Sequence, residues 1–190
     1  IVSISLLLRL LFTYFAPNTI DMNNYLVDVN ILRRGGNIYA EFPKYNYSPF
    51  WSYWLFGCSY LSTWFHLPFP FVLRTMLSLV DLANALLIFR ISHSLPTFAL
   101  YWLNPAAILI VSYHGQFETL AMLPLVISIS ILKKPNSYNK YLIWFLGTLS
   151  IVIKHITIFG VFTMFIYAVE RKRQAVLMML ASIIVFLGTF

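Results

Sequence analysis

Long apolar stretches restrict what this sequence can fold into more than any other feature. Charged residues make up only 10% of the chain, whereas a soluble domain averages about 25%. The mean hydropathy is +0.78. A chain of this kind is typical of all-α proteins that cross a membrane several times. The apolar stretches are Ile1–Phe15, Pro49–Phe65, Phe71–Phe89, Thr97–Ser112, Thr119–Leu132, Tyr141–Ile153, Ile156–Val169 and Ala175–Phe190.

The basic residues favour one orientation of these segments. Lys and Arg gather at the cytoplasmic ends of membrane helices, so the net charge of +7 is no indication of nucleic-acid binding. Seven crossings bring all three basic clusters to the cytoplasmic side. Pro49–Phe65 then lies along the outer surface of the membrane or re-enters the membrane from that side. We therefore predict about seven transmembrane helices, with an outer loop of surface helices over residues 17–65. The clusters are Arg90 with His93, Lys133–Lys134 with Lys140, and Arg171–Arg173.

The outer loop is the main polar segment of the chain and carries half of its six acidic residues. Within it, the spacing of apolar residues predicts a helix over Asp21–Leu32 that ends at Gly35–Gly36. Tyr39 to Tyr47 is expected to be extended. The chain begins and ends inside apolar runs, so we expect residues 1–190 to be one module of a longer protein. The single Cys58 excludes an intrachain disulfide.

Three short groups on the outer side carry the candidate chemistry. A carboxylate at the edge of a membrane can act as a general base on a hydroxyl group. A carboxylate with an imidazole can hold a divalent metal, and basic side chains can hold a lipid phosphate. The groups are Asp21 with Asp28, His114-Gly115-Gln116-Phe117-Glu118, and Lys154-His155. Arg74 and Asp81 form a fourth set on one face of the segment Phe71–Phe89.

Structural interpretations of the same residues stay open beside the chemical ones. Asp21 is also a suitable N-cap for the surface helix. His114 and Glu118 suit a solvated turn, and Lys154 suits a side chain that reaches lipid head groups. Arg74 and Asp81 suit an internal ion pair. The aromatic residues from Tyr45 to Trp54 suit anchoring at the membrane surface as well as sugar binding.

The order of these features resembles the GT-C superfamily of membrane glycosyltransferases. It is similar to the mannosyl- and glucosyltransferases that use dolichyl-phosphate sugars, including the GPI mannosyltransferase I type. The resemblance covers nearly the whole chain. It is carried by Asp21 beyond the first helix, Gly35 to Tyr39, Tyr45-Asn46-Tyr47-Ser48-Pro49, Leu103-Asn104-Pro105, Ser112 to Glu118, and Lys154-His155.

The resemblance implies roles for individual residues. Asp21 takes the place of the catalytic base, although many relatives have an Asp-x-Asp pair where this chain has Asp21-Met22-Asn23. This departure weakens any requirement for a metal and leaves Mg²⁺ or Mn²⁺ open. The resemblance further implies that the outer motifs bind substrate and that the basic residues lie near the lipid phosphate. The implied substrate-binding residues are Asp28, Tyr45, Tyr47, Arg74, His114, Gln116, Glu118, Lys154 and His155.

The expected function is transfer of a hexose, with mannose favoured, from a polyprenyl- or dolichyl-phosphate donor to a glycan or glycolipid acceptor. The configuration would be inverted, with Asp21 as general base. The expected location is the plasma membrane in a prokaryote or the endoplasmic reticulum in a eukaryote, with the active site outside or in the lumen. A polytopic transporter or lipid-glycan flippase, and a non-catalytic membrane subunit, are the alternatives.

Overall fold

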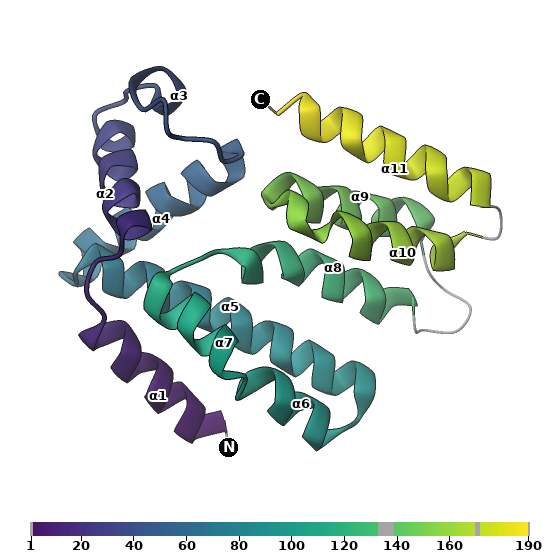
Figure 1. Ribbon diagram of the computed structural model, residues 1–190, viewed down its shortest axis with the longest axis horizontal. Coiled ribbons are helices and arrows are strands. Elements are labelled where there is room, and N and C mark those ends of the chain that lie inside the picture. Colours follow the sequence, from purple (N-terminus) through teal and green to yellow (C-terminus); the bar gives the residue numbers. More distant parts are fainter. Residues whose placement is uncertain (1, 133–138, 170–171, 190) are drawn as a thin grey trace.

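A computed structural model of the chain describes residues 2–132, 139–169 and 172–189. This part is all helical and contains no strand, which confirms the all-α class predicted from the sequence. Figure 1 shows three groups of helices, one built from the N-terminal and middle segments, one from the outer loop and one from the C-terminal segments. Together they form a layered bundle around α5 (Phe69–Ser92).

The first group packs on α5 through three of its four elements. It contains α1 (Val2–Phe15), α6 (Leu95–Trp102), α7 (Pro105–Ile108) and the π-helix η1 (Leu109–His114). Ser94 caps the start of α6 by accepting a hydrogen bond from the Thr97 amide. The apolar stretch predicted over Thr97–Ser112 forms a broken helix. Asn104 and Pro105 interrupt it, because proline cannot donate its backbone N–H, and the two halves are bent by 44°.

The second group is the outer loop, with α2 (Ile20–Arg33), α3 (Ile38–Glu41) and α4 (Pro49–Phe65). The predicted boundaries of α4 are correct, and those of α2 differ by one residue at each end. Gly35 follows α2 in the left-handed conformation, with φ +75°, as expected for a helix end. The extended structure predicted from Tyr39 is corrected by α3, for which Asn37 supplies the N-cap.

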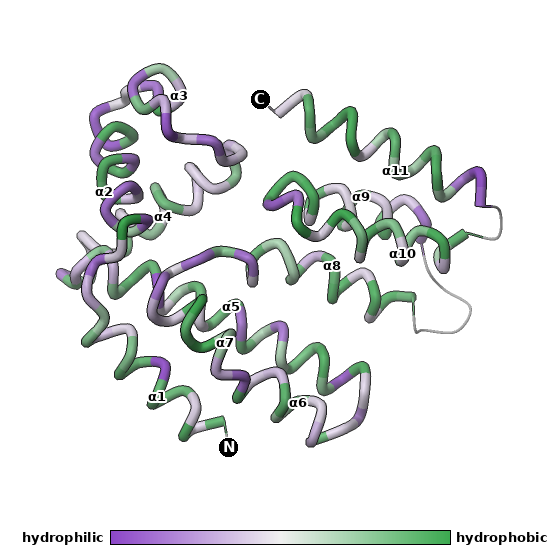
Figure 2. Tube along the Cα trace, in the orientation of Figure 1, coloured by the Kyte–Doolittle hydropathy of each residue, from purple (hydrophilic) through white to green (hydrophobic). Residues whose placement is uncertain are grey.

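The third group contains α8 (Glu118–Leu132), α9 (Lys140–Ile153), the 3-10 turn η2 (His155–Thr157), α10 (Ile158–Ala168) and α11 (Lys172–Leu187). These helices pack through an apolar core that includes Ile143, Val161 and Phe165. Lys133 and Lys134, and Arg171 of the third basic cluster, lie outside the described residues. Figure 2 shows that hydrophobic residues dominate this group, whereas hydrophilic residues are concentrated in α2 and α3.

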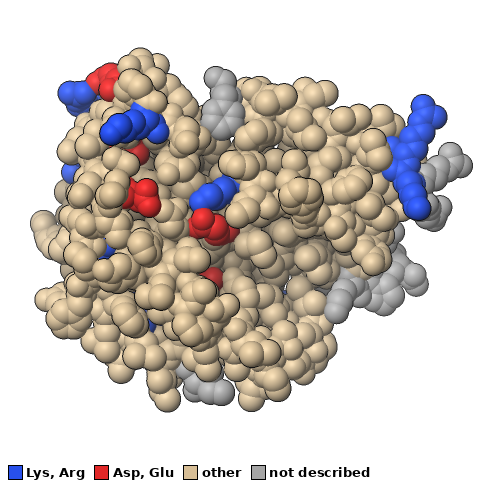
Figure 3. Space-filling model, in the orientation of Figure 1, with Lys and Arg blue, Asp and Glu red and all other residues tan. Residues whose placement is uncertain are grey.

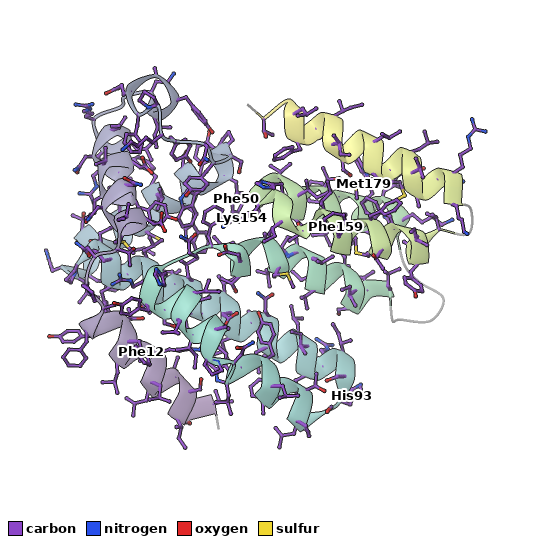
Figure 4. All side chains as sticks on the ribbon, in the orientation of Figure 1. Phe12, Phe50, His93, Lys154, Phe159 and Met179 are labelled. Atoms are coloured by element: carbon purple, nitrogen blue, oxygen red, sulfur yellow. The ribbon has the colours of Figure 1, made fainter. Side chains whose placement is uncertain are left out.

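The ends of the helices alternate between two sides of the molecule. Figure 1 shows the end of α1, the start of α5, the end of η1, the start of α8 and the α9–α10 turn on the side of the outer loop. The α5–α6 turn and the starts of α9 and α11 lie at the other end. In Figure 4, Lys154 and His93 are labelled at these two ends. The chain direction therefore follows the alternation predicted from the basic residues.

Only part of this bundle has helices long enough to cross a membrane by length and hydropathy alone. Among the described residues α5 passes this test, and the bent pair of Leu95–Trp102 with Pro105–His114 passes if it is counted as one span. A straight crossing needs about 20 residues. The helices α1, α8, α9 and α10 are apolar but shorter than that, so the seven crossings predicted from the sequence stay a prediction.

Candidate functional site

Asp21 lies in the first turn of α2 and contacts a residue distant in the sequence. Its Oδ2 atom accepts a hydrogen bond of 2.6 Å from Nε2 of Gln116. Thr19, not Asp21, is the N-cap, because its hydroxyl accepts the bond from the Met22 amide. The alternative role of Asp21 as a cap is therefore wrong, and its partly exposed carboxylate is held by the turn between η1 and α8.

That turn is shaped by a π-helix and a glycine. The wide turns of η1 end at Gly115, which has φ +75° and donates to the carbonyl of Ile110. Single π-turns are often found at functional sites. A Cβ atom on Gly115 would lie 2.8 Å from the Met22 side chain and 3.4 Å from Cγ of Arg74. Glycine thus lets the turn approach α2 and α5 closely enough for Gln116 to reach Asp21.

Lys154 brings the α9–α10 turn to the same place. Its Nζ atom lies 2.6 Å from Oε1 of Glu118 and 4.4 Å from the centre of the Phe117 ring. Phe117 also stacks on Trp51 with ring centres 4.1 Å apart, and both aromatic side chains are fully buried. Figure 3 shows an acidic and a basic group touching near the centre of the molecular surface. One part of each predicted group is therefore brought to this place, namely Asp21, the turn from Gln116 to Glu118, and Lys154.

Two tyrosines complete the surroundings of the carboxylates. The rings of Tyr25 and Tyr47 lie 6.2 Å apart, and Tyr47 packs edge-on against Phe117. Burial raises the pKa of Tyr25, and the charges of Asp21 and Glu118 raise it further. Burial likewise raises the pKa of Tyr47, and the carboxylates of Asp21, Asp28 and Glu118 add to that effect. Both phenols therefore stay neutral and can donate hydrogen bonds near the acids.

Asp28 and Tyr45 lie in the interior of the outer loop. Asp28 is 1% exposed, and neither carboxylate oxygen has a hydrogen-bond partner among the described residues. Burial raises the pKa of Asp28 to about 7. The Tyr45 hydroxyl lies 2.6 Å from Oγ of Ser52 and 3.3 Å from the carbonyl of Ser48. Trp51 and Tyr45 are buried, so these two rings are neither surface anchors nor an exposed platform for a sugar.

Three further predicted residues lie outside the contacts around Asp21. His114 is exposed next to Tyr113, and His155 is exposed with its ring 6.1 Å from that of Phe186. Arg74 lies under Gly115 and donates to the carbonyls of Ala16 and Pro17, at 3.1 and 2.8 Å. The structure thus uses Arg74 to close the end of α1.

The suggested ion pair between Arg74 and Asp81 is wrong. Asp81 pairs instead with Arg9 of α1, at 2.8 Å, and both side chains are buried. Tyr101 and Thr119 donate to Asp81 at 2.8 and 3.1 Å. Seven-residue spacing places Arg74 and Asp81 on one face of α5, but the packing of α1 against that helix decides which cation reaches the carboxylate.

Tyr25 is the site residue that the sequence reasoning did not single out. Its ring lies 5.1 Å from that of Trp51, and its hydroxyl lies within electrostatic reach of Asp21. The available signal was its spacing, since residues four apart lie on the same face of a helix. Phe117 was noticed only as part of a motif. Its buried position beneath Lys154 follows from the turn, which the sequence pattern does not specify.

Within the described residues, no three His, Cys, Asp or Glu side chains come close enough together to hold a metal ion. The arrangement therefore consists of a carboxylate fixed by an amide, a second carboxylate paired with a lysine, and two neutral phenols. Comparisons of the chain with protein-family models, with curated proteins and with solved structures found no match. The chemical properties of these residues thus carry the functional argument.

Proposed function

We propose that the chain is part of an integral membrane glycosyltransferase with Asp21 as its general base. It would transfer a hexose, with mannose favoured, from a polyprenyl-phosphate donor to a glycan or glycolipid hydroxyl. The observation that carries the proposal is the meeting of Asp21 with Gln116, and of Glu118 with Lys154, at the side of the bundle that bears the outer loop. These residues come from segments far apart in the sequence.

The distribution of side chains on α1 supports a location in the membrane. Its buried residues are Ser5, Arg9 and Thr13, all of them polar, whereas Ile4 and Leu7 are exposed. In water this arrangement would lose the benefit of burying apolar side chains, but in lipid it hides the polar groups. Exposed large apolar residues on α10 and α11 support the same location, among them Phe159, Tyr167, Ile184 and Leu187.

The geometry around Asp21 suits removal of a proton from an acceptor hydroxyl. Gln116 donates to Oδ2 of Asp21 and orients the carboxylate, leaving Oδ1 to accept the proton. The acceptor oxygen then forms a bond to the anomeric carbon as the bond from that carbon to the lipid phosphate breaks. The phosphate leaves with the electron pair. Because attack comes from the face opposite the leaving group, the configuration is inverted.

Lys154 has a different role in this proposal from the one that its charge alone suggests. Its ammonium is paired with Glu118, so it is not a free counter-ion for the lipid phosphate. The pair instead fixes the α9–α10 turn against the start of α8, and it leaves the buried Oε2 atom of Glu118 without a partner among the described residues.

The test compares Asp21→Asn with the unchanged full-length protein in membranes supplied with radiolabelled polyprenyl-phosphate mannose and glucose. The exchange keeps the size of the side chain but removes the base. We expect the transfer rate to fall by about a hundredfold or more, because general-base catalysis contributes roughly 10²–10⁴-fold. The preferred sugar is read from the same assay.

The matched control is Glu41→Gln, which removes an acid of the same loop at the exposed pair with Arg34. This variant should transfer label at the rate of the unchanged protein. Equal transfer by Asp21→Asn and the unchanged protein would exclude Asp21 as the base. No transfer from either donor by the unchanged protein would count against the enzyme and favour a non-catalytic role.

One observation favours a transporter or lipid-glycan flippase as the second candidate. The Arg9–Asp81 pair lies inside the bundle, and Ser112 extends it by contacts with Arg9 and with Ser78. Buried ionisable residues in membrane helices often line a path for a polar solute. Proteoliposomes containing a labelled lipid-linked sugar distinguish the two functions. Movement of label across the bilayer without transfer to an acceptor would support the transporter.

A further inference from the structure

A groove opens beside the outer loop, around the cation Arg74. It has a volume of about 610 Å³ and lies between the end of α1, the helix α2 and the turn that joins α4 to α5. Its wall is mostly apolar, with Leu26 and Phe71 among the lining residues. Tyr14 lines the groove and is 72% exposed, next to the exposed Phe15. Tyrosine side chains favour the head-group level of a bilayer.

Arg74 is a buried cation without a counter-ion in the part of the chain that the structure describes. It is 1% exposed, and none of the ion pairs among the described residues includes it. The carbonyls of Ala16 and Pro17 accept from its two terminal nitrogens, but they supply no negative charge. Its Nε atom has no partner among these residues. A buried charge left in this state is costly unless an anion approaches it.

The other described Lys and Arg side chains near this end of the molecule either have a counter-ion or, like Arg33 and Lys44, are exposed to water. Lys154 is paired with Glu118, and Arg34 is paired with Glu41. Arg33 donates to Ser59 and Thr63. Among the described Lys and Arg side chains near the candidate site, Arg74 is therefore the one that is buried without a counter-ion and lines a groove. Asn18 lines the same groove and can add amide donors.

We propose that this groove binds the phosphate of a membrane lipid with net negative charge, with Arg74 as counter-ion and the lipid chains running along α1 and α5. The inference rests on the proposed membrane location but not on the transfer reaction. A phosphate on an apolar chain matches both features of the groove, because a charged end meets the cation while the chain covers the apolar wall. An anionic phospholipid and a polyprenyl phosphate share this chemistry.

The test uses the full-length protein in nanodiscs of mixed phosphatidylcholine and phosphatidylglycerol, with native mass spectrometry of the lipids retained after release. We expect one phosphatidylglycerol to be retained in preference to phosphatidylcholine. Arg74→Gln should lower this preference about tenfold, as expected for loss of a charge-assisted hydrogen bond. Arg34→Gln, which removes an exposed positive charge away from the groove, should retain the lipid like the unchanged protein.

A second variant keeps the test decisive if Arg74→Gln fails to fold, since Arg74 also binds two carbonyls. Ala16→Trp fills the groove, yet leaves Arg74 and the carbonyl of Ala16 in place. It should lose the retained lipid to a similar extent. Equal retention of both lipids by the unchanged protein, or undiminished retention by Ala16→Trp, would overturn the proposal.

Added polyprenyl phosphate distinguishes the two lipid sources. Displacement of phosphatidylglycerol by it would identify the groove as the place of a sugar carrier, whereas its failure to compete would assign the groove to a phospholipid. Both outcomes require a lipid phosphate at Arg74. The variant Asp21→Asn distinguishes lipid binding from the transfer reaction. It should retain the lipid even though it no longer transfers label.

Discussion

At the scale of single residues, Asp28 has the most unusual surroundings in the outer loop. Its carboxylate is buried without a hydrogen-bond partner among the described residues. The charge of Asp28 acts on two titratable side chains of the facing segment, Tyr45 and Tyr47. Both phenols have raised pKa values. Burial raises the pKa of Asp28 to about 7 from an ordinary value of 3.8. At neutral pH the group is therefore divided between its neutral and charged forms.

Asp28 should make the stability of the protein depend on pH. An acid whose pKa is higher in the folded state binds more protons there, so stability falls as the pH rises from about 4 to about 7 and is then constant. The total loss is of order 4 kcal/mol, because each pKa unit corresponds to about 1.4 kcal/mol. We expect the Tm of the detergent-purified protein to fall between about pH 4 and about pH 7 and to level off above that.

Asp28→Asn should remove this dependence and raise the Tm at neutral pH, because the amide carries no charge to bury. Thermal melts of both proteins across the same pH range provide the measurement. Asp21→Asn is the matched comparison, since Asp21 is only partly buried and is already hydrogen bonded to Gln116. An unchanged pH slope in Asp28→Asn would show that ionisation of Asp28 does not control stability.

At the scale of elements, the turn between η1 and α8 decides whether the candidate site forms. Gly115→Ala should destabilise this turn for two reasons. The φ of +75° costs a residue with a Cβ atom roughly 1–2 kcal/mol, and that atom would also press on Met22 at 2.8 Å. Transfer should decrease as well, because displacement of the turn moves Gln116 away from Asp21.

The variant Gly35→Ala distinguishes the cost of the positive φ from the cost of the contact with Met22. Gly35 has the same φ of +75°, but a Cβ atom there would meet nothing within 4 Å. We expect Gly35→Ala to lose only the stability due to the backbone, as measured by thermal melting, and to keep its transfer activity. If both variants behave alike, close packing at Gly115 is not needed for the site.

Element boundaries were more predictable than the contacts between elements. Proline at the start of α4 and glycine after α2 mark those helices by local chemistry, so the sequence pattern indicated both of them. The break at Asn104–Pro105 carried the same kind of signal but was hidden within a continuous apolar run. The partner of Asp81 had no local signal, because Arg9 reaches it only after α1 has packed on α5.

At the scale of the whole molecule, the proposed crossings can be tested by cysteine labelling. A Cys58→Ser background removes the one natural thiol. Tyr39→Cys and His155→Cys lie on the side of the outer loop, whereas His93→Cys and Lys140→Cys lie at the opposite end. An impermeant maleimide applied outside sealed, right-side-out membranes should label the first two, and the other two only after permeabilisation.

Labelling of all four positions in sealed membranes would contradict the crossings. The test is needed because helices such as α1 and α9 have 14 residues each and are shorter than a straight span. Composition and basic residues were sufficient to predict an all-helical chain and the order of its turns. They were insufficient to predict how deeply each helix lies in the membrane. That depth depends on helix tilt and on the packing of polar faces such as the one formed by Ser5, Arg9 and Thr13.

The pairing of Arg9 with Asp81 also has a consequence for the membrane insertion of the protein during its synthesis. If α1 enters the bilayer as proposed, its arginine is synthesised before the outer loop, α4 and the aspartate that neutralises it. At roughly 5–20 residues per second this delay lasts several seconds. The first helix would therefore wait at the insertion machinery, and its release into lipid would depend on the arrival of α5.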